Sequence, residues 1–353
     1  MTKQRRHNSI LEALEKDGRE RVVSTRELAE RLAVSEMTIR RDLHEMDLEG
    51  LVQRLHGGAT LPHRSTVSAG QRGQIGILLT SSKDKYADPF FNAVLQGADR
   101  KLQESGYRTA YVFSFADVYT KEQARDLLQN YPVDGVILIG THYSRSVEYL
   151  KENVRVLIGT NYSLGPEHDA ILFDGATGIR TLVKHLAKLG RRRLGFITGY
   201  PDSREEGFLK GIKAHNLPDE PELRVRLVQG GFESWTPQIG QHGADMLMKQ
   251  KNPPDAIVCA SDRIAIGAMQ WLDQNGFRVP EDIAVTGFDN ISGSEFTIPP
   301  LTTVHVHKEL IGTLAAERAI RCIENPDEVP LQIWTPTSVI IRKSCGAAPE
   351  ENS

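Results

Sequence analysis

The hydrophobic pattern of the first sixty residues predicts three short helices followed by a β-hairpin. Apolar residues recur at helical spacing in residues 5–16, and Ser24-Thr25-Arg26-Glu27 is a capping-box sequence that opens a second helix. A third helix follows Ser35, whose side-chain oxygen can accept a free backbone N–H at a helix start. Together these helices can enclose one small apolar centre.

The third helix has two distinct faces. Ile39, Leu43 and Met46 recur at helical spacing and form its apolar face. Gly50 is expected to end the helix, since glycine readily adopts the left-handed conformation common at this position. Residues 51–58 then predict a strand and a tight turn, which together form a short β-wing.

The polar face of this helix and the wing carry side chains suited to DNA. Arginines on an exposed helix can enter the major groove, and basic residues of a hairpin can contact the flanking phosphates. The predicted DNA-binding residues are Ser35, Met37, Thr38, Arg40, Arg41, His44, Arg54 and His56. A structural helix hairpin with solvated arginines is the plainer alternative, and the helix-turn-helix frame argues against it.

This stretch resembles the winged helix-turn-helix domain of the DeoR family of bacterial regulators. The resemblance rests on Ser35, the run from Thr38 to Leu43, Gly50-Leu51, Arg54 and His56-Gly57-Gly58-Ala59. It covers about the first sixty residues without a gap, and it implies a DNA-binding domain over residues 1–61.

The rest of the chain shows a different pattern. Residues 62–73 are polar and small and show no periodicity, so we interpret them as a linker. Strands are then expected over 75–81, 109–115, 133–140, 154–162, 170–174, 193–200, 224–230, 256–260 and 283–289, and helices over 91–105, 121–130, 178–189, 204–216, 237–249 and 263–275. Repeated β–α units predict parallel sheets flanked by helices, and the number of strands predicts two lobes.

Residues 74–345 resemble the effector domain of the LacI family, which is itself similar to periplasmic sugar-binding proteins. The resemblance rests on Asp88 to Phe91, Val133 to Ile137, Ser203-Arg204, Gly207-Phe208, Ala260 to Asp262, Ala265, Gly267-Ala268, Val279-Pro280, Asp282 to Val285, Gly287 to Asn290 and Pro299 to Thr303. It implies two Rossmann-like lobes joined by three crossing strands, a ligand cleft between the lobes, and a dimer.

The expected fold is therefore α/β, with a small winged helix-turn-helix followed by a two-lobed periplasmic-binding-protein-like domain of parallel sheets. We expect lobe one over about 74–173 and 301–325, and lobe two over about 174–300 and 326–345. The DNA-binding head and hinge helix of the LacI family are absent from this sequence, and so is the sugar-phosphate-sensing domain usual behind a DeoR head. The way in which a LacI hinge couples ligand to DNA therefore cannot be transferred.

Candidate ligand contacts lie where the predicted strands end, because ligands bind beyond the carboxyl ends of open parallel sheets. They are Asp88, Phe90, Phe91, Asn161, Arg204, Phe232, Trp235, Ser261, Asp262 and Asp289. Carboxylates and an arginine can pair with vicinal hydroxyls, and aromatic faces can stack on a sugar ring. This set suits a neutral polyol, with an acid sugar paired to Arg204 as the alternative.

Several of these positions also have purely structural interpretations. Asp262 could cap the helix over 263–275, and Asn161 could be only a turn residue. One of the two phenylalanines at 90 and 91 could belong to the core. The resemblance implies a stacking aromatic at Phe232, but the following residues depart from the family spacing, so Trp235 could take that role instead.

Composition narrows the choice of function. A net charge of −3 over 353 residues excludes a general polyanion binder, so any basic surface must be local. The three cysteines, Cys259, Cys322 and Cys345, are scattered and fit a reducing cytoplasm without a disulfide framework or a zinc pattern. We expect no signal peptide and no membrane span, because the N-terminal residues and the chain lack the necessary apolar runs.

Two classes of function remain. The first is a sequence-specific transcriptional regulator, with repression as the family expectation, whose partners are operator DNA, a small carbohydrate effector and a second copy of the chain. The second is an enzyme of carbohydrate metabolism that carries a DNA-binding head. The sequence has no GxxxxGK[ST] loop, no GxGxxG after a strand and no GxSxG elbow, so we expect no catalytic residues, cofactor or metal.

Overall fold

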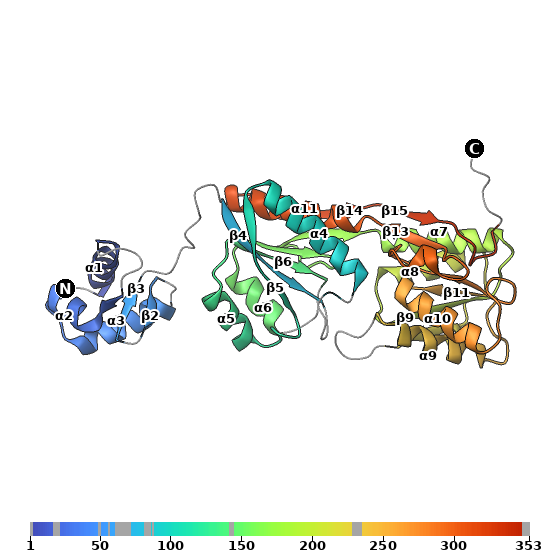
Figure 1. The fold of residues 1–353 in the computed structure, drawn as a ribbon, viewed down its shortest axis with the longest axis horizontal. Coiled ribbons are helices and arrows are strands. Elements are labelled where there is room, and N and C mark those ends of the chain that lie inside the picture. Colours follow the sequence, from blue (N-terminus) through green and yellow to red (C-terminus); the bar gives the residue numbers. More distant parts are fainter. Residues whose placement is uncertain are drawn as a thin grey trace. The chain divides into compact units, whose positions relative to one another are not determined.

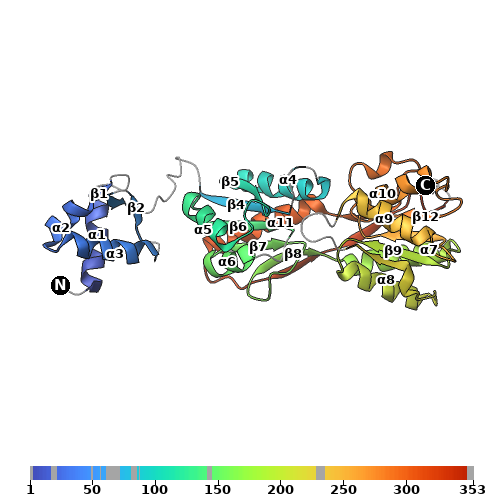
Figure 2. The same ribbon diagram turned by 90° about the horizontal axis from the view of Figure 1, so that it is seen from below.

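The chain forms two compact units, Met1–Gly70 and Gln71–Ser353 (Figures 1 and 2). The computed structural model describes residues 3–16, 22–48, 51–55, 57–60, 72–80, 86, 88–140, 145–227 and 235–347. The boundary at Gly70 falls inside the predicted linker. No helix among the described residues has the length and apolar character needed to cross a membrane.

The smaller unit has the predicted three helices and a wing. Its elements are α1 (Lys3–Lys16), β1 (Val23–Ser24), α2 (Thr25–Leu32), α3 (Glu36–Leu48), β2 (Gln53–Leu55) and β3 (Gly58–Thr60). The strands form an antiparallel sheet in the order β1-β3-β2. Ser24 Oγ accepts from the N–H of Glu27 at 3.1 Å, and Ser35 Oγ accepts from the N–H of Thr38 at 3.2 Å, so both predicted caps are confirmed.

The core of this unit follows the predicted apolar faces. Ile39, Leu43 and Met46 of α3 are fully buried, together with Ile10 of α1. A side chain on Gly58 would place its Cβ 2.3 Å from the carbonyl oxygen of Val23, so only glycine lets the wing pack on β1. The predicted helix end at residue 50 lies outside the described residues.

One lobe of the larger unit is built on a six-stranded parallel sheet in the order β14-β8-β7-β6-β4-β5. The strands are β4 (Gly73–Leu79), β5 (Tyr107–Ser114), β6 (Gly135–Ile139), β7 (Leu157–Thr160), β8 (Asp169–Phe173) and β14 (Gln332–Thr335), and the helices are α4 (Pro89–Glu104), α5 (Lys121–Asn130), α6 (Arg145–Asn153) and α11 (Lys308–Glu324). Ile75 and Ile77 pack with the α4 and α11 side chains, whereas Leu78 packs with those of α5 and α6. This alternation explains why β4 reads as a continuous apolar run.

The second lobe has a four-stranded parallel sheet in the order β10-β9-β11-β12. The strands are β9 (Leu194–Thr198), β10 (Arg224–Arg226), β11 (Ala256–Cys259) and β12 (Ala284–Thr286), the helices are α7 (Gly175–Lys188), α8 (Ser203–Ala214), α9 (Pro237–Met248) and α10 (Asp262–Gln274), and the short 3-10 helices are η1 (Pro221–Leu223) and η2 (Ser294–Phe296). Two further strands, β13 (Thr303–Val306) and β15 (Thr337–Ile340), form an antiparallel pair. The predicted α/β fold with parallel sheets is confirmed.

The chain passes between the lobes three times, and two of these crossings lie later than expected. The first, between β8 and α7, is near Phe173 as expected. The second lies between Val306 and Lys308 rather than near Pro300. The third lies between Thr335 and Thr337 rather than at the expected lobe limit directly after Asn325. The expected lobe limits were wrong because β13 bridges the end of β12 in lobe two, and β14 pairs with β8 in lobe one.

The sequence pattern also missed helix α6. Only Ser146, Val147 and Leu150 of its nine residues are buried. A short helix with so few buried positions leaves a weak periodic signal between two strong strands. Its contribution to the fold is to cover one face of the lobe-one sheet beside α5.

Candidate functional site

The outer face of α3 presents the predicted DNA-binding side chains to solvent. Met37 is 80% exposed, and Ser35, Arg40, Arg41 and His44 are exposed as well. Thr38 is half-buried, and its hydroxyl lies 2.9 Å from that of Ser35. Arg54 of the wing is also exposed, whereas His56 lies outside the described residues.

A buried ion pair fixes this helix on the rest of its unit. Arg6 of α1 donates two hydrogen bonds to Asp42 of α3, and Asp42 is fully buried. Burial alone would raise the pKa of Asp42, but the hydrogen bond and charge of Arg6 outweigh it and lower the pKa. The charged carboxylate therefore anchors α3 from its inner side, which leaves the outer face free.

The wing is tied to the same helix. Arg54 Nη1 lies 3.1 Å from Nδ1 of His44, and the backbone N–H of Arg54 donates to Asp47 Oδ1 at 3.1 Å. Arg41, by contrast, forms no ion pair or hydrogen bond with any described residue. Its guanidinium is thus the side chain on this face most available to a base or a phosphate.

One group of potential metal ligands lies behind the helix. Ligand atoms of His7, Asp42 and Glu45 come within 4.8 Å of one another. Arg6 already pairs with Asp42, and Lys3 Nζ lies 2.6 Å from Glu45 Oε2. Because these cations neutralise both carboxylates, the local charge does not favour a divalent ion.

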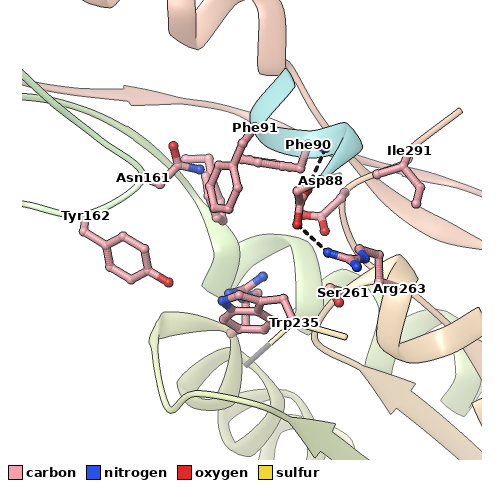
Figure 3. Close-up of a pocket in the computed structure, with 12 residues that line it drawn as sticks. Asp88, Phe90, Phe91, Asn161, Tyr162, Trp235, Ser261, Arg263 and Ile291 are labelled. Carbon is pink, nitrogen blue, oxygen red and sulfur yellow. Dashed lines mark hydrogen bonds and ion pairs between the residues drawn. The ribbon is translucent and has the colours of Figure 1, made fainter. Parts of the chain in front are cut away.

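The larger unit contains a cavity at the carboxyl ends of its strands, with about 460 Å³ of empty space that is partly open to solvent (Figure 3). It is lined by Asp88, Phe90, Phe91, Asn161, Tyr162, Phe173, Arg204, Trp235, Ser261, Arg263, Asp289 and Ile291. Eight of the predicted ligand contacts are in this set. Sequence reasoning missed Tyr162, Phe173, Arg263 and Ile291, although each lies at or close behind a strand end. Phe232 lies outside the described residues.

Lobe one supplies an aromatic wall and two polar groups. The rings of Phe90 and Phe91 pack edge to face, with their centres 5.5 Å apart. The ring of Phe90 also packs edge to face on that of Phe173, with the centres 6.2 Å apart. Asp88 caps α4, because its Oδ1 accepts from the N–H of Phe90 at 2.9 Å. Asn161 has a positive φ of 71°, and its buried Oδ1 has no hydrogen-bond partner.

Arg204 lines the cavity and is already paired with Asp202. Its Nε and Nη2 donate to Asp202, the N-cap of α8, and its Nη1 donates to the carbonyl oxygen of Ala260 at 2.6 Å. Its guanidinium carbon lies 4.1 Å from the Trp235 ring centre. Burial would lower the pKa of Arg204, but Asp202 outweighs it and raises the pKa, so the side chain stays charged.

Asp289 is the one carboxylate of the cavity lining whose side chain has no hydrogen bond to a described residue. It is 8% exposed and adopts a φ of 111°, which is unusual for a residue with a side chain. Lys308 of α11 donates to its backbone carbonyl oxygen at 2.5 Å. Burial raises the pKa of Asp289 well above its ordinary value, and the attraction of Arg204 opposes this only in part.

The expectation that Asp262 faces the ligand is not met. Asp262 is fully buried and accepts hydrogen bonds from the N–H of Ile291 at 2.9 Å and from the hydroxyls of Ser294 and Thr303. It also does not cap α10, since Ser261 does so through the N–H of Ile264 at 3.2 Å. Asp262 instead holds together the loop that carries Asp289. Its neighbour Arg263 faces the cavity and donates to Asp88 at 2.9 Å.

Two segments of the chain match described domain families. Residues 6–65 match the DeoR-like helix-turn-helix domain, and residues 183–345 match the periplasmic binding protein-like domain. The chain is 28% identical over 307 residues to the HTH-type transcriptional repressor PurR of Yersinia pestis (strain Pestoides F). The aligned region covers 84% of this chain and 87% of that protein.

Solved structures with the same fold include transcriptional regulators. A LacI transcriptional regulator from Bacillus cereus subsp. cytotoxis NVH 391-98 shares 25% identity at a TM-score of 0.70 over 78% of this chain and 99% of that one. The regulator CelR in complex with cellobiose shares 24% identity at a TM-score of 0.70 over 88% of this chain and 91% of that one. The chain is thus a bacterial transcriptional regulator that joins a DeoR-like helix-turn-helix domain to a periplasmic-binding-protein-like domain similar to that of LacI regulators.

Proposed function

We propose that this protein is a cytoplasmic, non-enzymatic repressor that binds operator DNA as a homodimer and responds to a neutral sugar in the cavity of its larger unit. The observation that carries the choice of ligand is the pairing of the two arginines of the cavity lining. Asp202 neutralises Arg204, and Asp88 neutralises Arg263. Among the described residues that line the cavity, an anionic ligand would therefore find no free positive charge.

The groups left without partners favour a ligand rich in hydroxyls. Asn161 Oδ1 is a buried acceptor without a donor, and Asp289 adds a carboxylate that no described residue satisfies. A buried acceptor that stays unsatisfied costs roughly 1–3 kcal/mol, so a donor from the ligand is favourable at each point. The faces of Phe91 and Trp235 supply the apolar contact that a sugar ring needs.

The same reasoning weighs against acid sugars and sugar phosphates. A carboxylate or phosphate would have to share an arginine whose charge Asp88 or Asp202 already neutralises, and it would lie close to Asp289. A flat heterocycle with exocyclic amines would share the aromatic faces and the acceptors, so nucleobases belong in the same test. The binding of cellobiose by CelR supports a fold that accommodates sugars.

Arg41 is exposed on α3, and the contact between Arg6 and Asp42 holds the opposite face of this helix on α1. This arrangement supports insertion of α3 into the major groove of DNA. Two copies would place two such helices on half-sites one helical turn, or a multiple, apart. The ligand can change DNA affinity only if it binds the two states of the protein with different affinity.

The experiment that tests this proposal is a thermal-shift screen of the purified full chain. Its panel holds neutral mono- and disaccharides, uronates, sugar phosphates and nucleobases. A ligand at 100 times its dissociation constant adds about 2.7 kcal/mol of stability, which is easily seen. We expect a shift from a neutral sugar and none from its uronate or phosphate. A shift confined to anions or nucleobases would refute the proposed ligand class.

A further inference from the structure

We propose that the ion pair between Asp88 and Arg263 is a clasp that holds the two lobes closed over the ligand. The inference rests on the proposed ligand cavity and adds a role for Arg263, which the sequence analysis did not single out. The two residues lie 175 positions apart in the chain, and Nη1 of Arg263 donates to Oδ2 of Asp88 at 2.9 Å (Figure 3). Both side chains line the cavity.

The two partners belong to different lobes. Asp88 is the N-cap of α4, which packs in lobe one, and Arg263 lies in the first turn of α10, which packs in lobe two. Their side chains are only 14% and 26% exposed, so solvent screens the pair less than a surface ion pair. Any separation of the lobes at this edge must break the contact.

The position of Arg263 in its helix determines which partner loses more when the ion pair breaks. A cation in the first turn of a helix faces the positive end of the helix dipole, where it is unfavourable. Asp88 supplies the compensating charge, and Arg263 has no other ion pair among the described residues. Asp88 keeps the N–H of Phe90 as a partner when the lobes part, whereas Arg263 loses its anion. Opening therefore has an electrostatic cost that falls mainly on Arg263.

The pair also leaves hydrogen-bonding capacity for a ligand. Each oxygen of Asp88 accepts one hydrogen bond from the described residues, at Phe90 and at Arg263, and retains a second acceptor site toward them. Arg263 retains N–H groups that no described residue accepts. A ligand hydroxyl can thus bind to the closed pair without breaking it. Arg263 is thus a positioning residue, which holds lobe two against lobe one through its ion pair with Asp88.

The first test needs no ligand and measures the distance between the lobes. Nitroxide labels are placed at Lys121→Cys in lobe one and Glu281→Cys in lobe two, both exposed positions, in a Cys322→Ser background. Asp88→Asn keeps an oxygen that can cap α4, and Arg263→Gln removes the charge. We expect a single short distance in the parent and a longer, broader distribution in each variant. The double variant should resemble either single variant.

The control is Arg278→Gln, which removes an exposed arginine paired with Asp282 inside lobe two. It should leave the distance distribution unchanged. Distributions for Asp88→Asn and Arg263→Gln that match the parent would overturn the clasp, whatever the ligand proves to be.

The second test uses the sugar found in the thermal-shift screen. Arg263→Gln should raise the ligand dissociation rate by about tenfold, the effect of one lost, partly buried ion pair, and it should reduce the dependence of that rate on salt. If no sugar binds, the proposed ligand fails while the label distances still decide on the clasp. If sugar binds and both variants release it at the parent rate, the clasp fails while the proposed ligand stands.

Discussion

The guanidinium of Arg204 lies 4.1 Å from the centre of the Trp235 ring, while Asp202 holds its outer edge. This arrangement makes Arg204 a buried support for an aromatic surface rather than a free cation. An arginine clamped by an aspartate and a carbonyl group loses most of its attraction for an anion. The cavity thus presents aromatic carbon and hydrogen-bond acceptors, which is the physical basis of the proposed preference for a neutral sugar.

Asp289→Asn should weaken ligand binding without destabilising the fold. Loss of the carboxylate removes acceptor capacity for a ligand hydroxyl, at about 1.5–3 kcal/mol of binding free energy. Burial raises the pKa of Asp289, so its charged form is unfavourable in the folded state, and its removal should not lower the free energy of unfolding. Calorimetric titration and urea unfolding measure the two effects. Equal ligand affinity in the variant would remove Asp289 from the site.

Asp262 should make the stability of the larger unit fall as the pH rises. Burial raises its pKa from 3.8 to about 6, so the folded state binds the proton more tightly than the unfolded state. Its contribution is fully present below pH 4 and is lost as the pH rises through 6, by on the order of 3 kcal/mol. Urea unfolding between pH 4 and pH 8 should show this slope in the parent. If the free energy of unfolding of Asp262→Asn changes with pH in the same way as that of the parent, the predicted effect of Asp262 is wrong.

Gly267→Ala should destabilise the second lobe. A Cβ at Gly267 would lie 1.9 Å from the carbonyl oxygen of Pro237, because α9 and α10 touch backbone to backbone at this point. The steric cost of about 1–3 kcal/mol should outweigh the gain of roughly 1 kcal/mol in helix propensity. Gly293→Ala is the matched control, since its Cβ would meet no atom within 4 Å and its φ is −73°. Thermal unfolding of the two variants compares them directly.

Arg41→Ala should weaken specific DNA binding by about 1–3 kcal/mol and leave ligand binding unchanged. The side chain is exposed on α3 and has no partner among the described residues, so its loss should not disturb the fold. Affinity is measured on a fragment selected from random DNA by the parent protein. Arg26→Ala is the control, because this arginine of α2 is also exposed but pairs with Glu30. Unchanged affinity for Arg41→Ala would refute the predicted recognition role.

We predict that an exposed apolar pair forms the contact between the two copies of the proposed homodimer. Phe296 and Ile298, next to η2, are 77% and 96% exposed. Large apolar side chains left in solvent are typical of surfaces that bury them on association. Phe296→Asp with Ile298→Asp should therefore convert a dimer to a monomer in sedimentation experiments. Val329→Asp, which replaces another exposed apolar residue, should leave the dimer intact, and a dimeric double variant would exclude this surface.

The sequence alone determined most of the elements, though not α6 or α11, and most of the cavity lining, because both depend on local periodicity. Helical spacing identified Ile39, Leu43 and Met46 as the buried face of α3. The rule that ligands bind beyond the carboxyl ends of parallel strands brought together residues as distant as Asp88 and Asp289, which do line one cavity.

Only the tertiary structure decided which of these groups have partners. Asp262 and Arg263 are neighbours in the chain, yet one is buried beneath a loop and the other faces the cavity. The partners of Arg263 and of Asp262 lie in other segments, at Asp88 and at Ser294. The positions of the later crossings between lobes likewise depend on strand pairing across the chain. Periodicity shows which face of an element is buried, but neutralisation of a charge depends on contacts that no local pattern records.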